Sequence, residues 1–418
     1  MREMKDSKVA WIGAIPQDWQ LSKIGSLYTQ RNEKVSDKDY QPLSVTMQGI
    51  LPQLVTAAKT DDGDNRKLVR VGEFAINSRS DRRGSCGISP LDGSVSLINI
   101  ILTPRTAMHP GYYNWLFHTT LFADEFYKWG HGIVADLWTT RWQEMKSITV
   151  PVPEYAEQKR IAAFLDAECA EIDAVLEKTR ASIEEYKKLK QAVITQAVSK
   201  GVRGDRPMKD SGIEWIGNIP AEWEIKRVKN ICSLKTGSTP STGNAEWFNG
   251  DLLWFTPGDF NEKFVLSSSN RTLSRTAEKD GVATIIPANS VLVVCIGGTA
   301  GKVGYTNYGC SCNQQITALC KSNIMPKLLM YDVNAGMPFL RNTTMFTTLP
   351  ILNNQAIGDL VLPIPREEEQ LSIIEYLDEK CAGIDALIAK KQQYLTEIEN
   401  YKKSLIYEYV TGKRRLYK

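Results

Sequence analysis

Residues 151–174, PVPEYAEQKRIAAFLDAECAEIDA, return as residues 363–386, PIPREEEQLSIIEYLDEKCAGIDA. The two stretches share Pro-x-Pro, Glu-Gln, Leu-Asp, Cys-Ala and Ile-Asp-Ala at a constant offset of 212 residues, without a gap. The same offset relates Lys190, Ile194 and Val198 to Lys402, Ile406 and Val410. An ungapped match of this length indicates an internal duplication.

A second repeated block precedes each of these stretches. Residues 4–19 return as residues 208–223 at an offset of 204, with Met-Lys-Asp-Ser, Trp-Ile-Gly, Ile-Pro and a closing Trp in both copies. The inserts that follow, residues 20–150 and 224–362, share little sequence. The pattern indicates a duplicated frame that carries two different inserts.

Each Pro-x-Pro block opens a segment with the composition of a long helix. Residues 154–198 contain no Gly or Pro and are rich in Ala, Glu, Lys and Leu, which favours helix. We therefore expect a first long spacer helix within residues 151–203 and a second within residues 363–418. Apolar side chains recur at steps of three and four residues, and the side chains expected to pack between the helices are Ile172, Val175, Ile183, Tyr186, Leu189, Val193, Ile384, Leu387, Leu395, Ile398, Tyr401 and Leu405.

These two helices are expected to pack against each other as an antiparallel coiled coil. At 1.5 Å per residue, each would be about 65 Å long, which is too long to fold back inside one small domain. The second helix must return toward the start of the chain, so its end should lie beside the block at residues 4–19. The result would be a pseudo-twofold ring that nearly closes. A coiled-coil spacer alone is compatible with many functions.

The inserts have the pattern of α+β globules. Short β-rich runs at residues 94–102, 252–256, 284–286 and 291–296 are separated by Gly, Pro, Asn and Asp turns. A helix is expected at residues 111–129. The expected division of the chain is therefore a globular domain at residues 1–150, a spacer helix at 151–203, a globular domain at 204–362 and a spacer helix at 363–418.

Composition excludes several classes of protein. The 418 residues are 42% hydrophobic and 24% charged, which is typical of folded domains. With 51 Lys and Arg against 48 Asp and Glu, the net charge is only +3, so any DNA-binding charge must be local. No apolar run is long enough to span a bilayer, and the charged start MREMKDSKVAWIG lacks the apolar core of a signal peptide. We therefore expect a cytoplasmic protein.

Metal and nucleotide motifs are incomplete. The eight cysteines form no C-x-x-C pair and the chain has three histidines, which argues for reduced thiols rather than a zinc site. Residues 297–302, GGTAGK, resemble a phosphate loop, but Ile296 and Val303 stand where that motif requires Gly and Ser or Thr. The backbone amides there could still hold a nucleic-acid phosphate, although a plain turn is equally compatible. The candidate residues are Gly298, Thr299 and Lys302.

A nuclease-like set is present but weak. Asp136, Glu144 and Lys146 resemble a carboxylate–lysine triad, yet the positions equivalent to Glu144 and Lys146 at the 212 offset are Ala356 and Gly358. We expect no catalytic centre, no metal and no cofactor on this chain. A stand-alone metal-dependent endonuclease is one alternative.

Two polar clusters in the inserts are candidates for reading DNA bases. The first contains Arg79, Arg82 and Arg83, and the second contains Asn313, Gln314 and Gln315. Arg pairs with guanine and Asn or Gln with adenine in the major groove. Solvated loops are the plainer explanation, but two such clusters midway along the inserts of a duplicated frame favour DNA reading.

The order of motifs resembles the specificity subunit of type I restriction–modification systems. The resemblance covers essentially the whole chain and extends to residues 254–259 and 296–304. The residues that carry it are Pro151, Pro153, Gln158, Ile161, Leu165, Asp166, Trp215, Ile216, Gly217, Ile219, Pro220 and Trp223, with their repeat partners.

The resemblance implies two target-recognition domains, each of which reads half of an asymmetric, bipartite site on double-stranded DNA. The helices would set the spacing and dock two methyltransferase subunits, which bring S-adenosylmethionine and methylate adenine. Restriction subunits would add ATP- and Mg²⁺-dependent translocation and cleavage. The specificity subunit itself has no catalytic activity and no cofactor. The second alternative is a coiled-coil adaptor that does not bind DNA.

Overall fold

The computed structural model describes residues 3–53, 63–132, 138–261, 264–343 and 351–416. The chain forms two compact units. The N-terminal unit comprises Met1–Arg180 and Gln393–Lys418, and the C-terminal unit comprises Ala181–Gln392. Each long helix contributes to both units. No described helix combines the length and the apolar character needed to cross a bilayer.

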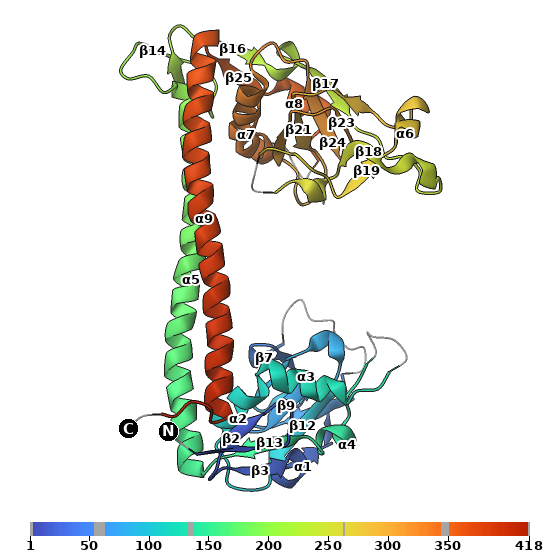
Figure 1. The fold of residues 1–418 in the computed structure, drawn as a ribbon, viewed down its shortest axis with the longest axis vertical. Helices are drawn as coiled ribbons and strands as arrows, with labels where there is room; N and C mark the ends of the chain where they lie inside the picture. Colours follow the sequence, from blue (N-terminus) through green and yellow to red (C-terminus); the bar gives the residue numbers. More distant parts are fainter. Residues whose placement is uncertain (1–2, 54–62, 133–137, 262–263, 344–350, 417–418) are drawn as a thin grey trace. The chain divides into compact units, whose positions relative to one another are not determined.

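The two long helices are α5, Tyr155–Lys200, and α9, Glu367–Val410 (Figure 1). In the N-terminal unit, the first part of α5 pairs with the last part of α9, because Lys402 Nζ lies 2.6 Å from Asp173 Oδ1. In the C-terminal unit, the last part of α5 pairs with the first part of α9, because Lys190 Nζ lies 2.8 Å from Asp385 Oδ1. The reversed order means that the helices are antiparallel. This confirms the expected fold class.

Seven-residue periodicity sets the seam between the helices. Buried residues lie at positions of a heptad repeat, and half-buried residues occupy other positions of the same repeat, which is the pattern of a coiled coil. Those on α5 are Leu165, Cys169, Leu176, Thr179, Ile183, Lys190 and Ala197. Those on α9 are Leu377, Cys381, Ile384, Ile388, Leu405 and Tyr409. At the 212 offset, four of the α9 residues correspond to buried α5 residues, and Ile384 and Leu405 correspond to the half-buried Ile172 and Val193.

Part of the predicted packing stripe was wrong. Ile183, Ile384 and Leu405 are buried, and Ile172, Tyr186, Val193, Leu395 and Ile398 are half-buried. By contrast, Val175, Leu189, Leu387 and Tyr401 are 40%, 48%, 44% and 51% exposed. The seam passes instead through the next residue in each case, which is Leu176, Lys190, Ile388 and Lys402. At Leu189 and Tyr401 the prediction preferred an apolar side chain to the neighbouring lysine, whereas the heptad places the lysine inward.

The repeated blocks build the same frame in both units. In the N-terminal unit, β1 (Met4–Asp6) pairs with β2 (Ala14–Pro16), and β3 (Gln20–Lys23) pairs with β13 (Thr149–Val152). The corresponding pairs in the C-terminal unit are β14 (Met208–Asp210) with β15 (Asn218–Pro220) and β16 (Glu224–Arg227) with β25 (Val361–Ile364). Trp19 Nε1 donates to Glu157 Oε2 at 2.9 Å, and Trp223 Nε1 donates to Glu369 Oε2 at 2.9 Å. Pro151 therefore lies in a strand, and α5 begins only after it.

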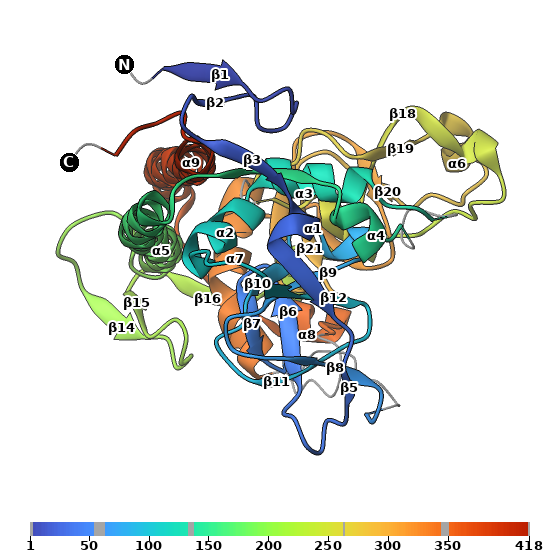
Figure 2. The same ribbon diagram turned by 90° about the horizontal axis from the view of Figure 1, so that it is seen from below.

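The end of α9 returns to the first block, as expected. The Tyr407 hydroxyl donates to the backbone oxygen of Ile12 at 2.9 Å, and the Tyr112 hydroxyl donates to that of Val410 at 2.7 Å. Figure 2 shows the β1–β2 hairpin beside the end of α9. Trp19, Leu405 and Val410 lie in one buried cluster.

The two inserts share a sheet topology despite their different sequences. In the N-terminal unit the strand order is β10-β9-β12-β4, and in the C-terminal unit it is β22-β21-β24-β17, with every neighbouring pair antiparallel. The strands of the first sheet are β4 (Tyr28–Arg31), β9 (Phe74–Asn77), β10 (Cys86–Ile88) and β12 (Asn99–Pro104). Those of the second are β17 (Ser233–Thr236), β21 (Ser290–Val294), β22 (Val303–Thr306) and β24 (Ile316–Cys320).

A helix follows each of these sheets and is fixed to a long helix. In the N-terminal unit it is α2 (Pro110–Phe117), followed by α3 (Thr120–Lys128), and in the C-terminal unit it is α7 (Pro326–Thr343). The His109 amide donates to Gln158 Oε1 at 2.8 Å, and the Met325 amide donates to Gln370 Oε1 at 2.9 Å. The helix expected at residues 111–129 is interrupted, because Thr119 caps the start of α3 through the Phe122 amide.

The remaining elements complete the two globules. In the N-terminal unit they are α1 (Ile24–Leu27), β5 (Lys34–Val35), β6 (Leu43–Thr46), β7 (Gly49–Pro52), β8 (Arg66–Val69), β11 (Gly93–Val95) and α4 (Trp142–Met145). In the C-terminal unit they are β18 (Phe248–Phe255), β19 (Arg271–Leu273), α6 (Arg275–Lys279), β20 (Ile285–Ile286), β23 (Cys310–Cys312) and α8 (Asn354–Asp359).

Candidate nucleic-acid interface

Each four-stranded sheet brings two loops together at one end. In the N-terminal unit the β9–β10 turn lies beside the segment that enters β12, because Asn77 at the end of β9 is opposite Asn99 at the start of β12. In the C-terminal unit the β21–β22 turn lies beside the segment that enters β24, since Val294 is opposite Ile316. The Cys295 amide also donates to the Gln315 carbonyl at 2.7 Å.

This topology changes which clusters correspond. The sequence suggested that Arg79–Arg83 and residues 313–315 occupy equivalent places. The β9–β10 turn, which carries Arg79–Arg83, instead corresponds to the β21–β22 turn, which carries the Gly-rich residues 297–302. Residues 313–315 lie in the neighbouring loop of the same sheet end. All the candidate residues therefore lie in the two neighbouring loops at the equivalent end of each four-stranded sheet.

The arginine turn has a fixed backbone and an exposed head group. The Tyr127 hydroxyl donates to the carbonyls of Asn77 at 3.1 Å and Arg82 at 3.3 Å. The Arg82 side chain is 69% exposed, with Nε 3.6 Å from Asp81 Oδ2. Arg83 is paired with Asp124 of α3. Arg79 is half-buried, and its backbone forms an isolated bridge to Thr139. Arg82 is thus the most accessible of the three guanidinium groups.

The Gly-rich turn is shaped by two residues with positive φ. Gly297 has φ +102° and Gly301 has φ +89°, a region that glycine adopts without steric cost. The Ala300 amide donates to Gly297 O at 2.9 Å and the Lys302 amide donates to Thr299 O at 3.1 Å. Gly298 is exposed and Thr299 is half-buried. Lys302 Nζ donates to the Phe260 carbonyl at 3.1 Å, so the cation is held by a neutral acceptor.

The assignment of Asn313 as a base-reading residue needs correction. Asn313 is only 8% exposed, and its amide is used within the turn. Its Nδ2 donates to Gln315 Oε1 at 3.0 Å, and its Oδ1 accepts the Gln315 amide at 3.1 Å. Gln314 is the exposed amide of this loop and accepts a hydrogen bond from the Thr239 hydroxyl. Gln314 is therefore better placed than Asn313 or Gln315 to meet a base edge.

The structure gives no support to the nuclease alternative. Asp136 lies outside the described residues. Glu144 accepts the Arg141 amide at 2.9 Å in the capping box of α4, and Lys146 Nζ donates to Gln143 Oε1. No group of three or more His, Cys, Asp and Glu residues in the described part of the chain could hold a metal ion. Glu144 and Lys146 thus have local structural roles.

Burial makes the cysteines poor nucleophiles. All eight are free and buried. Desolvation raises the pKa of Cys169 and of its repeat partner Cys381 to about 11 each. Because a thiolate is the reactive form, these groups serve as small apolar side chains.

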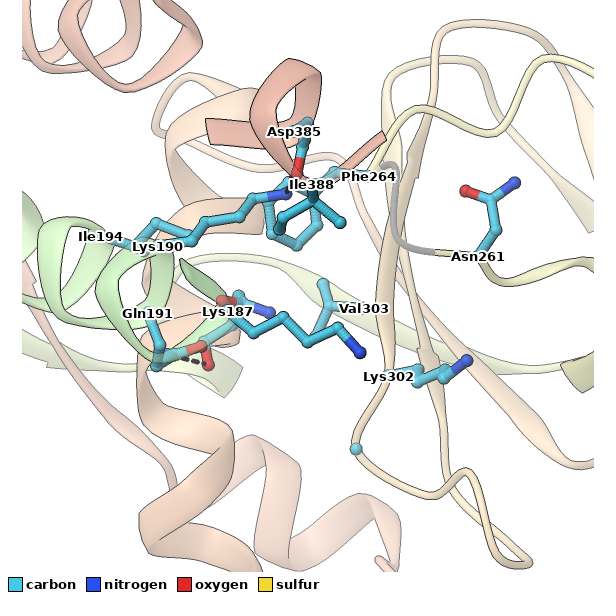
Figure 3. A pocket seen from close by; sticks show the side chains of 12 residues that line it. Lys187, Lys190, Gln191, Ile194, Asn261, Phe264, Lys302, Val303, Asp385 and Ile388 are labelled. Carbon is cyan, nitrogen blue, oxygen red and sulfur yellow. Dashed lines mark hydrogen bonds and ion pairs between the residues drawn. The ribbon is translucent and has the colours of Figure 1, made fainter. Parts of the chain in front are cut away.

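A small charged pocket lies in the C-terminal unit, beside the Gly-rich turn (Figure 3). Its volume is about 240 Å³, and its walls include Lys187 and Lys190 of α5, Asp385 of α9, and Lys302. Lys190 Nζ lies 2.8 Å from both carboxylate oxygens of Asp385. The sequence prediction missed Lys190 as an inward residue, although its exact repetition as Lys402 was a usable signal.

Comparison with known proteins agrees with this architecture. Residues 220–399 match the family model described as type I restriction modification DNA specificity domain. Over part of its length the chain is also similar in sequence to specificity subunits of type I restriction enzymes. Among these specificity subunits, that of the type I restriction enzyme MjaIX from Methanocaldococcus jannaschii is 27% identical over 39% of this chain and 40% of its own length. The MjaVIII specificity subunit of the same organism is 25% identical over 65% of this chain and 63% of its own length.

The chain thus aligns with less than two thirds of the length of these specificity subunits. A solved structure, from work on complex assembly and conformational transition of the type I R-M system, shares the fold with a TM-score of 0.73. It is 15% identical, and the match covers 96% of this chain and 99% of that one.

Proposed function

We propose that this chain is the DNA-specificity subunit of a type I restriction–modification complex and that it has no catalytic activity of its own. The observation that carries the proposal is the duplication itself. Both units have the same frame and the same sheet order, but the loops at the equivalent sheet end differ in sequence. A common scaffold with two different polar loop sets suits a protein that reads two different half-sites.

The recognition domains would be residues 1–150 and 204–362. In the first, Arg82 would contact a base edge in the major groove, and in the second Gln314 would do so. The exposed amide of Gly298, with Thr299 and Lys302, suits a DNA phosphate, which positions the domain without reading sequence. Arg79 and Arg83 would support the first loop.

The spacer helices, within residues 151–203 and 363–418, would set the gap between half-sites. A helix of 46 residues has a length of about 69 Å at 1.5 Å per residue. With 34–36 Å per turn of DNA, this corresponds to about two turns. The recognised site would therefore be two short sequences separated by a fixed number of unread bases.

Two methyltransferase subunits would dock on the helices. Four exposed apolar side chains support this, because they form two equivalent pairs at the 212 offset: Val175 with Leu387, and Leu189 with Tyr401. Duplicated patches suit two copies of one partner. The partners would supply S-adenosylmethionine and flip the target adenine for methylation, and restriction subunits would supply ATP- and Mg²⁺-dependent cleavage. The complex would act in the cytoplasm.

The test is to map methylated adenines in the host genome with and without this gene. The expected result is one bipartite motif, with a constant gap, that loses methylation when the gene is removed. No change in the methylation pattern would contradict the proposal. Cutting of DNA by the purified chain with magnesium alone would favour the endonuclease alternative instead, and binding of protein partners without sequence-selective DNA binding would favour the adaptor.

A further inference from the structure

Two equivalent lysines lie in the helix seam. Lys190 and Lys402 are related by the 212 offset, and each forms an ion pair with an aspartate of the other long helix. Lys190 Nζ is 2.8 Å from both oxygens of Asp385, and Lys402 Nζ is 2.6 and 2.7 Å from those of Asp173. The two aspartates are themselves repeat partners. The two lysines therefore form equivalent ion pairs between the helices.

The surroundings of the two lysines differ. Lys190 also lies over the ring of Phe264, with Nζ 4.5 Å from the ring centroid. Figure 3 shows the ammonium between Asp385 and this ring. The Lys190 side chain is 10% exposed, whereas that of Lys402 is 22% exposed. Within the described part of the chain, no aromatic ring covers Lys402. Because a cation–π contact strengthens when it is desolvated, Phe264 gives Lys190 a contact that its repeat partner lacks.

Phe264 connects the helix seam to the candidate DNA loop. Its carbonyl accepts the Tyr305 amide at 2.7 Å, and the Leu266 amide donates to the Tyr305 carbonyl at 2.7 Å. Tyr305 lies in β22, which follows the Gly-rich turn directly. The Phe264 ring also meets Tyr331 of α7 edge-on, with centroids 5.7 Å apart. Contacts thus run without a break from Lys190 through Phe264 to the strand that carries the turn.

We propose that Lys190 is a positioning residue for DNA reading by the C-terminal unit, acting by holding Phe264, and with it the β21–β22 turn, at a fixed orientation on the spacer helices. This inference rests on the proposed function. It assigns the repeat partner Lys402 a purely structural role. A loss of the Lys190–Phe264 contact should relax base discrimination in one half-site without changing contacts to DNA directly.

The experiment uses the full chain in complex with its methyltransferase subunits. Methylation rates are measured on DNA with single-base changes in either half-site, and photo-cross-linking from position 314 identifies the half-site read by the C-terminal unit. The variants are Lys190→Met, Phe264→Leu, and the matched control Lys402→Met. Phe264→Leu leaves the ion pair intact, so it remains informative if Lys190→Met fails to fold. Thermal unfolding of each variant reports the purely structural effect.

Lys190→Met and Phe264→Leu should each reduce discrimination at the C-terminal half-site by on the order of tenfold, with discrimination at the other half-site unchanged. The double variant should lose no more than either single variant, and Lys190→Arg should restore discrimination. Lys402→Met should leave the discrimination at both half-sites unchanged.

Equal behaviour of Lys190→Met and Lys402→Met, or full discrimination in Phe264→Leu, would overturn the inference. A wild-type complex that discriminates at neither half-site would instead overturn the proposed function, so the two failures are distinguishable.

Discussion

Asp332 should destabilise the C-terminal unit increasingly as the pH rises. It lies in α7 with 0% exposure, and neither carboxylate oxygen has a hydrogen-bond partner in the described structure. Burial raises its pKa well above the ordinary value of 3.8. In the unfolded chain the carboxyl ionises at its ordinary pKa, whereas in the folded chain it stays protonated to higher pH. Stability is therefore lost as the pH rises above about 4.

Replacing Asp332 with Asn removes this ionisation at constant volume. An unpaired buried polar group costs about 1–3 kcal/mol, and more when it must ionise. We expect the stability gain of Asp332→Asn over the wild type to be smallest at low pH and to grow by about 2 kcal/mol between pH 4.5 and pH 8. For a unit of this size that corresponds to about 4–8 °C in Tm. Calorimetry at both pH values measures the difference.

The control is Asp359→Asn. The pKa of Asp359 is lowered, chiefly by its hydrogen bond from Lys229, so its contribution to stability is present at neutral pH and is lost as the pH falls. This variant should therefore be less stable than the wild type at pH 8, which is the opposite sign. A gain from Asp332→Asn that does not grow between pH 4.5 and pH 8 would refute the reasoning.

Three further predictions concern DNA reading and the frame. Arg82→Ala should weaken binding to one half-site by about 1–3 kcal/mol, measured on DNA with each half-site altered in turn; an equal loss on random DNA would show phosphate contact only. Deleting residues 177–183 and 392–398, one heptad from each helix, should shorten the preferred gap by about three base pairs, because seven residues span about 10 Å; methylation mapping that finds the original gap would contradict this. Trp223→Phe should lower the free energy of unfolding by about 1–3 kcal/mol, because it leaves the buried Glu369 without the indole donor. Unchanged stability in calorimetry would show that the hydrogen bond from Trp223 to Glu369 does not stabilise the fold.

The duplication made the frame predictable. Two copies of one pattern disclosed the long helices, their antiparallel pairing and the return of the chain end to the block at residues 4–19. The error was local. A stripe chosen by hydrophobicity selected Leu189, whereas the coiled-coil geometry required the next residue, Lys190. The ion pair with Asp385 helps to make a buried lysine tolerable there, and that partner is 195 residues away.

The inserts were less predictable for a different reason. Their common strand order leaves little trace in the sequence, because pairing of backbone groups fixes topology while the side chains vary. The correspondence between the β9–β10 turn, which carries Arg82, and the β21–β22 turn, which carries Gly298, became clear only from the strand pairing. The structural role of Asn313 within its turn could not be predicted either, since the sequence does not show whether an Asn is exposed or buried. Gln314, one residue further on, has the opposite exposure.

The division of both long helices between the two units has a consequence for synthesis. The core of the N-terminal unit includes Leu405, Tyr409 and Val410, which leave the ribosome long after residues 1–180. At about 5–20 residues per second, residues 1–180 wait roughly 10–40 s for residues 393–418 to be made. During that interval Leu165 and Ile161 of the nascent chain lack their α9 neighbours. The N-terminal unit can therefore finish folding only after the whole C-terminal unit has been synthesised.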